Sequence, residues 1–134
     1  MKVHTEIVSF DTKGEIDFRD LTGDIEGIVD RSGIKDGFTL VFAPHATGVI
    51  VFTEYERGLL EDIRMTLRTL FPREGRYRHP ANAHSHIRSM FLTPSKVIPV
   101  LDGRLGLGTW QSVCWIEVDH VPRTRRVIVE VLGE

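Results

Sequence analysis

The apolar patterns at the two ends of the chain constrain its fold most strongly. In the closing segment RVIVEVL, Val127, Val129 and Val131 take alternate positions, which places them on one face of a strand. The opening KVHTEIVSF and the later TWQSVCWIEV are also typical of strands, and helical patterns lie between them. This order predicts an α+β fold with a mostly antiparallel sheet or sandwich and two to three helices.

Three segments have the apolar spacing of helices. The first begins at the candidate cap Thr22 and ends near Gly33. The second is long. Thr53 and Glu56 have the spacing of a capping box at its start, and Pro72 ends it. The third is HIRSMFL, which has helical spacing and precedes a proline.

Two turns are expected to join neighbouring strands. EIDF is predicted to extend the first strand as a hairpin across residues 12–14. Asp102 and Gly103 lie between the apolar arms of VIPVLDGRLGLG and supply the positive φ of a tight turn. FTLVFA and GVIVFT are also predicted strands, and the polar APHATG connects them.

Composition limits what the chain can bind. Its 134 residues suit one domain, residues 1–134, and 41% hydrophobic with 27% charged residues is typical of globular proteins. A net charge of -2 gives no basis for general nucleic-acid binding. No apolar run reaches the roughly 18 residues of a membrane span, and the start lacks the apolar stretch of a signal peptide. We therefore expect a cytoplasmic protein with neither a nucleic-acid nor a membrane partner. Cys114 is expected to be a buried small side chain rather than a catalytic thiol.

Half of the six histidines lie in one short segment. RYRHPANAHSHIRS, residues 76–89, contains His79, His84 and His86. Imidazoles are the commonest protein ligands of zinc, so these three are the candidate metal ligands. In an extended segment, His84 and His86 would point to the same side, whereas in a helix they would diverge by about 200°. The two patterns agree if His84 lies in a loop and His86 in the first helical turn, where free N–H groups attract a phosphate. The alternative is a polar surface loop.

A second polar segment, APHATG, connects two apolar runs and carries His45 and Thr47. Loops between rigid elements often hold functional side chains. Glu54 follows at the predicted start of the long helix, where it complements the helix dipole, orients a histidine or takes a proton. These three residues are the catalytic candidates.

Ligand-binding candidates lie near the C-terminus. RLGLGTWQ lacks the context of a nucleotide loop, but Trp110 could stack on a planar ring and Gln111 could hydrogen-bond to it. The alternative is a core tryptophan. The segment PRTRR, which includes Arg125, either clamps a phosphate or forms a solvated strand edge.

HATGVIVFTE, YRHPANAHSHI, PVLDGRLGLGTWQSV and RTRRVIVEVLGE resemble the successive motifs of the YjbQ-like family, also called the secondary thiamine-phosphate synthase family. The likeness covers nearly the whole chain. It implies an α+β fold and a homotrimer with a polar pocket near subunit contacts. The matching pocket positions are His45, Thr47, Glu54, His79, Asn82, His86, Trp110 and Gln111.

The resemblance implies a reaction on small phosphorylated metabolites: a pyrimidine diphosphate condenses with a thiazole phosphate to give thiamine phosphate. A divalent metal held by the histidines would neutralise the diphosphate, and imidazole ligands favour zinc over magnesium. Two alternatives stay open. One is a zinc-assisted hydrolase or other metalloenzyme, and the other is a non-catalytic trimeric binding module for a phosphorylated metabolite.

Overall fold

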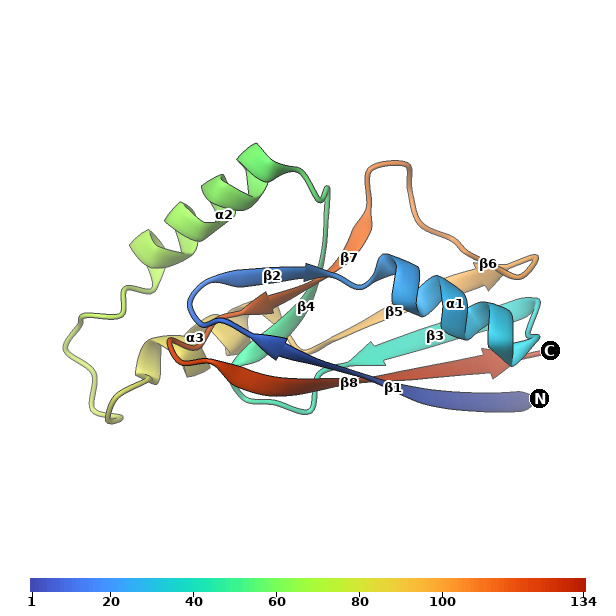
Figure 1. Ribbon diagram of the computed structural model, residues 1–134, viewed down its shortest axis with the longest axis horizontal. Coiled ribbons are helices and arrows are strands. Elements are labelled where there is room, and N and C mark those ends of the chain that lie inside the picture. The colour runs from blue at the N-terminus through green and yellow to red at the C-terminus, as the bar shows by residue number, and fades with distance from the viewer.

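Two antiparallel sheets and three helices make up the fold, which a computed structural model describes for residues 1–134 (Figure 1). The strands are β1 Lys2–Thr12, β2 Asp17–Asp20, β3 Asp36–Phe42, β4 Gly48–Thr53, β5 Ser95–Leu101, β6 Arg104–Leu105, β7 Ser112–Glu117 and β8 Arg123–Gly133. The helices are α1 Thr22–Ser32, α2 Arg57–Leu70 and α3 Ala83–Leu92. The predicted α+β fold with antiparallel sheets and two to three helices is confirmed. None of the three helices has the length and the apolar composition that a membrane-spanning helix needs.

The larger sheet has the strand order β1-β8-β3-β5-β6. The closing strand β8 lies between β1 and β3, so both of its edges are hydrogen-bonded over much of its length. Val127, Val129 and Val131 are fully buried on its inner face, as their alternation predicts. Asp102 and Gly103 form the predicted two-residue turn between β5 and β6, with φ of 51° and 77°.

The smaller sheet, in the order β2-β7-β4, lies between two hydrophobic clusters. On one side, Trp115 of β7 packs with the valines of the larger sheet and with α1, which contributes Ile25 and Ile28. On the other side, Cys114 packs with Leu67 of α2. Cys114 is fully buried, as expected, and this burial raises the pKa of its thiol to about 12.

Two local predictions are wrong. β2 does not form a hairpin with β1, because it pairs with β7 in the smaller sheet while β1 pairs with β8. The capping box at α2 is also absent: Thr53 ends β4, and Glu56 is itself the N-cap, accepting a hydrogen bond from the Leu59 N–H at 2.6 Å. Glu54 therefore lies in the connection before α2 and not at its start.

The outer face of the larger sheet is unusually apolar. Strand pairing places its residues opposite to the buried valines, on the side that no helix of the chain covers (Figure 1). The exposed members of this outer face are Val3, Ile7, Phe38, Phe42, Val97 and Leu101. Thr5 and Glu130 lie among them, and an exposed face with this many apolar side chains is typical of an interaction surface.

Candidate functional site

The histidine-rich segment separates into two sites, because α3 begins at Ala83 and includes both His84 and His86. The expectation that His84 lies in the loop is therefore wrong. Side chains two residues apart on a helix point about 200° apart. His84 accordingly turns into the protein and is fully buried, whereas His86 stays near the surface and faces His79.

His79, Asn82 and His86 form the first cluster, which we call the His79 cluster. The imidazole rings of His79 and His86 lie edge to face with 4.8 Å between their centroids. The His79 Nε2–H donates a hydrogen bond to Asn82 Oδ1 at 3.1 Å. Asn82 is the N-cap residue of α3, but its side chain makes no capping hydrogen bond. Its amide therefore orients the imidazole instead of satisfying the helix end.

His84 belongs to a second, buried cluster that the sequence did not indicate. Its Nε2 lies 3.3 Å from Glu15 Oε2, and the Arg88 Nη1 lies 3.3 Å from the same oxygen. The ring of His120 lies with its centroid 5.5 Å from that of His84. Burial, reinforced by the charge of Arg88, lowers the pKa of His84 despite the opposing effect of Glu15. His84 is thus a neutral interior side chain that fastens α3 to the loop between β1 and β2.

Asp119 ties the same end of α3 to the connection between β7 and β8. It accepts hydrogen bonds from Ser85 Oγ at 3.2 Å, the His120 N–H at 2.8 Å and Arg123 Nη2 at 2.8 Å. Burial alone would raise the pKa of this carboxyl group. The hydrogen bonds and the charge of Arg123 outweigh that effect and lower the pKa to about 2.

Asp119 should make stability depend on pH in the acid range. Its folded pKa of about 2 lies below the ordinary value of 3.8, so its contribution is present above pH 4 and is lost as the pH falls towards 2. That contribution is about 2 kcal/mol at 1.4 kcal/mol per unit. We expect Asp119→Asn to lower the free energy of unfolding by about that amount at pH 7 and by much less at pH 2. Urea denaturation at both pH values measures this, and an equal loss at both would contradict it.

His45 and Thr47 lie in the connection between β3 and β4, where they contact Arg126 and Arg125 near the start of β8. β3 separates from β8 after the pair Phe42 and Ile128, which leaves the backbone of Arg126 without a strand partner on that side. The His45 Nε2 takes this place and accepts a hydrogen bond from the Arg126 N–H at 3.1 Å. Burial and the charge of Arg125 lower the pKa of His45, so the neutral imidazole is favoured.

Arg125 is engaged in the interior. Its Nε donates to Glu117 Oε1 at 2.6 Å, and its Nη2 donates to Thr47 O at 3.0 Å and Thr47 Oγ1 at 2.9 Å. The guanidinium carbon also lies 5.5 Å from the centre of the Trp115 ring. Only 4% of Arg125 is exposed. As a ligand-binding candidate, Arg125 therefore offers no free surface to a phosphate, and it stabilises the loop that carries His45.

Glu54, Trp110 and Gln111 lie at the opposite end of the smaller sheet. β4 and β7 pair Thr53 with Ser112, which brings the connections next to them together. Trp110 is 72% exposed, so the alternative of a core tryptophan is wrong. The Gln111 Oε1 accepts a hydrogen bond from the Gly108 N–H at 2.8 Å and braces this loop.

One chain therefore does not assemble all the predicted site residues. β4 has six residues, so at 3.3 Å per residue about 20 Å separate Glu54 from the His45 loop. No three side chains of His, Cys, Asp or Glu come together in a way that could hold a metal ion. Of the predicted ligands His79, His84 and His86, a single chain brings only the first and the last together.

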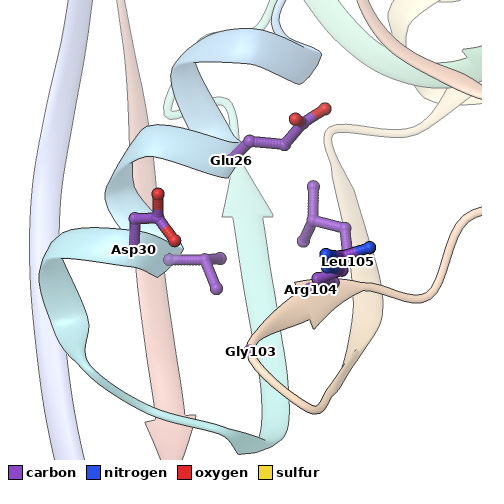
Figure 2. A pocket seen from close by; sticks show the side chains of 6 residues that line it. Glu26, Asp30, Gly103, Arg104 and Leu105 are labelled. Carbon is purple, nitrogen blue, oxygen red and sulfur yellow. The ribbon is translucent and has the colours of Figure 1, made fainter.

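The largest cavity lies away from every predicted site residue. It has a volume of about 490 Å³ and lies between α1 and the β5–β6 turn. Figure 2 shows the carboxylates of Glu26 and Asp30 on α1, with Arg104 at the start of the facing strand β6. A smaller cavity of about 300 Å³ adjoins the His79 cluster and is lined by Arg73, Tyr77 and Arg78, among others.

The interior charges Glu15, Glu117 and Asp119 were missed at the level of sequence. For the pair of Glu117 and Arg125 a signal existed. Arg125 has the same parity as Val127, Val129 and Val131 in β8, so strand alternation alone turns it inward. An inward guanidinium requires a buried carboxylate, and Glu117 ends the apolar strand β7.

Comparison with known proteins gives one consistent result. Residues 6–134 match the model of the family described as UPF0047 protein YjbQ-like. A UPF0047 protein of Methanothermobacter thermautotrophicus is 38% identical over 100% of this chain and 95% of its own length. One of Archaeoglobus fulgidus is 42% identical over 90% of this chain and 95% of its own length.

Solved structures agree with this. A crystal structure from Sulfolobus solfataricus, described as a YbjQ-like protein of unknown function, has a TM-score of 0.96 at 38% identity and covers 99% of both chains. An uncharacterized protein of the same family from Clostridium acetobutylicum has a TM-score of 0.91 at 36% identity, covering 95% of this chain and 99% of its own. The chain belongs to the YjbQ-like UPF0047 family.

Proposed function

We propose that the protein is a homotrimeric enzyme that acts on a small phosphorylated metabolite at the His79 cluster. Thiamine-phosphate formation is the reaction to test first. The observation that carries this proposal is the pair of imidazoles of His79 and His86, 4.8 Å apart and oriented by Asn82. Two imidazoles next to each other near a surface suit proton transfer to an oxygen of a bound phosphate.

In the condensation, the bond between the pyrimidine methylene carbon and the diphosphate oxygen breaks, and the diphosphate leaves with the electron pair. The lone pair of the thiazole nitrogen forms the new carbon–nitrogen bond. The negative charge that develops on the leaving diphosphate needs a donor. His86 in its protonated form supplies a proton to that oxygen, and Asn82 holds the neighbouring ring of His79 in place through the His79 Nε2–H.

A divalent ion bound by the neutral rings is the alternative to proton donation by them, with zinc preferred to magnesium because the donors are imidazoles. A catalytic zinc site normally has three protein ligands, and one chain provides His79 and His86. A further donor would have to come from the substrate or from a second copy of the chain. When bound, the ion would polarise a phosphate oxygen.

The proposed homotrimer is supported by the outer face of the larger sheet. Ile7 and Val97 are more than half exposed there, and their cross-strand partners Ile128 and Leu40 are also apolar. Association of three copies would cover such faces and form a closed assembly. The separation of Glu54 from the His45 loop within one chain also favours a site completed by a neighbouring copy.

The variant Ile7→Lys/Val97→Lys tests the trimer. Burying two ammonium groups in an apolar interface is unfavourable, so we expect the assembly to dissociate into single chains that keep their secondary structure. Light scattering during size-exclusion chromatography gives the mass. Met65→Lys is the matched control, because Met65 is 65% exposed on α2 and outside the outer face. A wild-type protein with the mass of one chain would contradict the trimer.

The activity is tested with purified protein, a pyrimidine diphosphate and a thiazole phosphate. We expect His86→Ala to reduce thiamine-phosphate formation by about 100-fold, as loss of a general acid does. His4→Ala, on β1 and remote from the cluster, is the control and should keep full activity. Formation at an unchanged rate in His86→Ala would overturn the mechanism.

The same protein distinguishes the two alternatives. Chelator-sensitive release of phosphate without thiamine phosphate would identify the zinc-assisted hydrolase. Saturable ligand binding without turnover would identify the binding module.

A further inference from the structure

The loop between α2 and α3 concentrates positive charge that the chain leaves uncompensated. Residues 73–78 read REGRYR, and they carry Arg73, Arg76 and Arg78 against one carboxylate, Glu74. Many guanidinium groups elsewhere in the chain pair with carboxylates, as Arg88 does with Glu15 and Arg123 with Asp119. The three arginines of this loop take part in no such pair.

This loop surrounds a cavity of about 300 Å³. Arg73, Glu74, Tyr77 and Arg78 line it together with His79, which also belongs to the His79 cluster. The cavity therefore opens beside the imidazole pair. It is large enough for a phosphate or diphosphate group but small for a whole substrate.

Local contacts hold the loop in this shape. The Tyr77 hydroxyl donates a hydrogen bond to Pro72 O at 2.7 Å, which closes the loop onto its own start. Gly75 packs so closely on the Tyr77 ring that a Cβ atom there would lie 2.7 Å from Cε2. The arginines thus extend from a braced turn, and less ordering is required when they bind an anion.

We infer that the Arg73–Arg78 loop is a phosphate subsite that binds the phosphate or diphosphate group of the metabolite next to the His79 cluster. This inference rests on the proposed function and deepens it by naming the residues that hold the anionic group. Guanidinium groups suit this role because each can donate two parallel hydrogen bonds to phosphate oxygens. Arg125, the arginine that sequence analysis favoured, is already bonded to Glu117 and Thr47.

The position of the subsite gives it a chemical role. A diphosphate held by Arg73 and Arg78 would present its oxygens to the imidazole of His79, which lines the same cavity. Positive charge around the group would stabilise it as it departs, and the imidazole pair would supply the proton. Binding should weaken as salt rises, because the arginines are exposed to solvent.

Binding of inorganic pyrophosphate tests the subsite directly. Isothermal titration with the full chain is expected to show saturable binding that Arg73→Gln/Arg78→Gln weakens by at least about tenfold, since charge-assisted hydrogen bonds are lost. Arg104→Gln is the matched control: Arg104 is also exposed and unpaired, but it lines the cavity at α1. Unchanged binding by the control and unchanged thermal midpoints for both variants complete the expected result.

Several outcomes would overturn the inference. Competition with pyrophosphate by sulfate and by chloride is measured at matched ionic strength, and displacement by either anion as effective as by phosphate counts against a phosphate subsite. An affinity for pyrophosphate that falls equally in Arg104→Gln would also contradict it.

Failure of the subsite and failure of the proposed function remain separable. His86→Ala should bind pyrophosphate within about threefold of wild type while losing turnover, because the arginines stay in place. Pyrophosphate binding that depends on Arg73 and Arg78 in a protein without turnover would support the subsite and reject the enzyme. Turnover with a KM unaffected by Arg73→Gln/Arg78→Gln would support the enzyme and reject the subsite.

Discussion

Replacing Arg125 by methionine is expected to lower the free energy of unfolding by about 3–5 kcal/mol, the usual effect of removing one partner of a buried ion pair. Methionine keeps much of the side-chain volume but leaves the Glu117 carboxylate without its main partner. Two weaker hydrogen bonds to Glu117 persist, from Thr12 Oγ1 at 2.9 Å and from the Asp119 N–H at 3.2 Å. Thr47 loses a donor for both of its oxygens.

Equilibrium urea denaturation measures this loss, and the double variant Glu117→Gln/Arg125→Met provides the control. A neutral amide in place of the carboxylate removes the uncompensated charge. The double variant should therefore be less destabilised than the sum of its single variants, by 1 kcal/mol or more, about the coupling found between residues in direct contact. Additive losses would show that the two side chains do not act as a pair.

The substitution Arg125→Met should also affect the loop that carries His45. Arg125 binds Thr47, and the backbone of Arg126 holds His45, so two neighbouring residues of β8 fix both catalytic candidates of APHATG. In Arg125→Met we expect the His45 imidazole to become more mobile and more exposed. This change would raise its pKa from the lowered value, because burial and the charge of Arg125 cause the lowering. Titration by NMR detects it.

Local patterns predicted the elements of the fold but not all their partners. Alternating valines identified β8, and an Asp-Gly pair identified the β5–β6 turn, since both depend on residues close in sequence. The partner of β2 could not be predicted in this way. β2 pairs with β7, nearly 100 residues later, and the choice depends on burying Phe18 and Ile16 near Cys114 and α2.

The histidines show the same limit. The density of histidines in the sequence identified the segment that carries the His79 cluster. In the structure, a helix that begins at Ala83 separates His84 from His86. If the start of the helix moves by two residues, a side chain next to it can point in the opposite direction. Helix boundaries are the least certain feature of a sequence pattern. Arg125 could have been placed in the interior by strand parity, whereas Glu15 carries no local signal because the loop that holds it is irregular.

Gly48→Ala is the second substitution with a large expected effect, a loss of about 3 kcal/mol, at the upper end of what overpacking costs. A Cβ atom at Gly48 would lie 2.1 Å from Cζ2 and 2.2 Å from Cη2 of the Trp115 ring. Trp115 is fully buried, with the rings of Phe10 and His45 at 5.4 and 5.8 Å between centroids. The indole therefore has no free space into which it can move, and β4 or the ring must shift.

Gly23→Ala gives the matched control with the opposite sign. Gly23 lies in the first turn of α1, and a Cβ atom there meets nothing within 4 Å. Alanine in a helix is favoured over glycine by about 0.5–1 kcal/mol, so this variant should be slightly stabilised. Urea denaturation compares the two variants, and near-ultraviolet circular dichroism reports on the Trp115 environment. Equal stability of Gly48→Ala and wild type would show that the indole can move. The Trp115 ring would then not be a rigid support for the side chains of His45 and Arg125 that contact it.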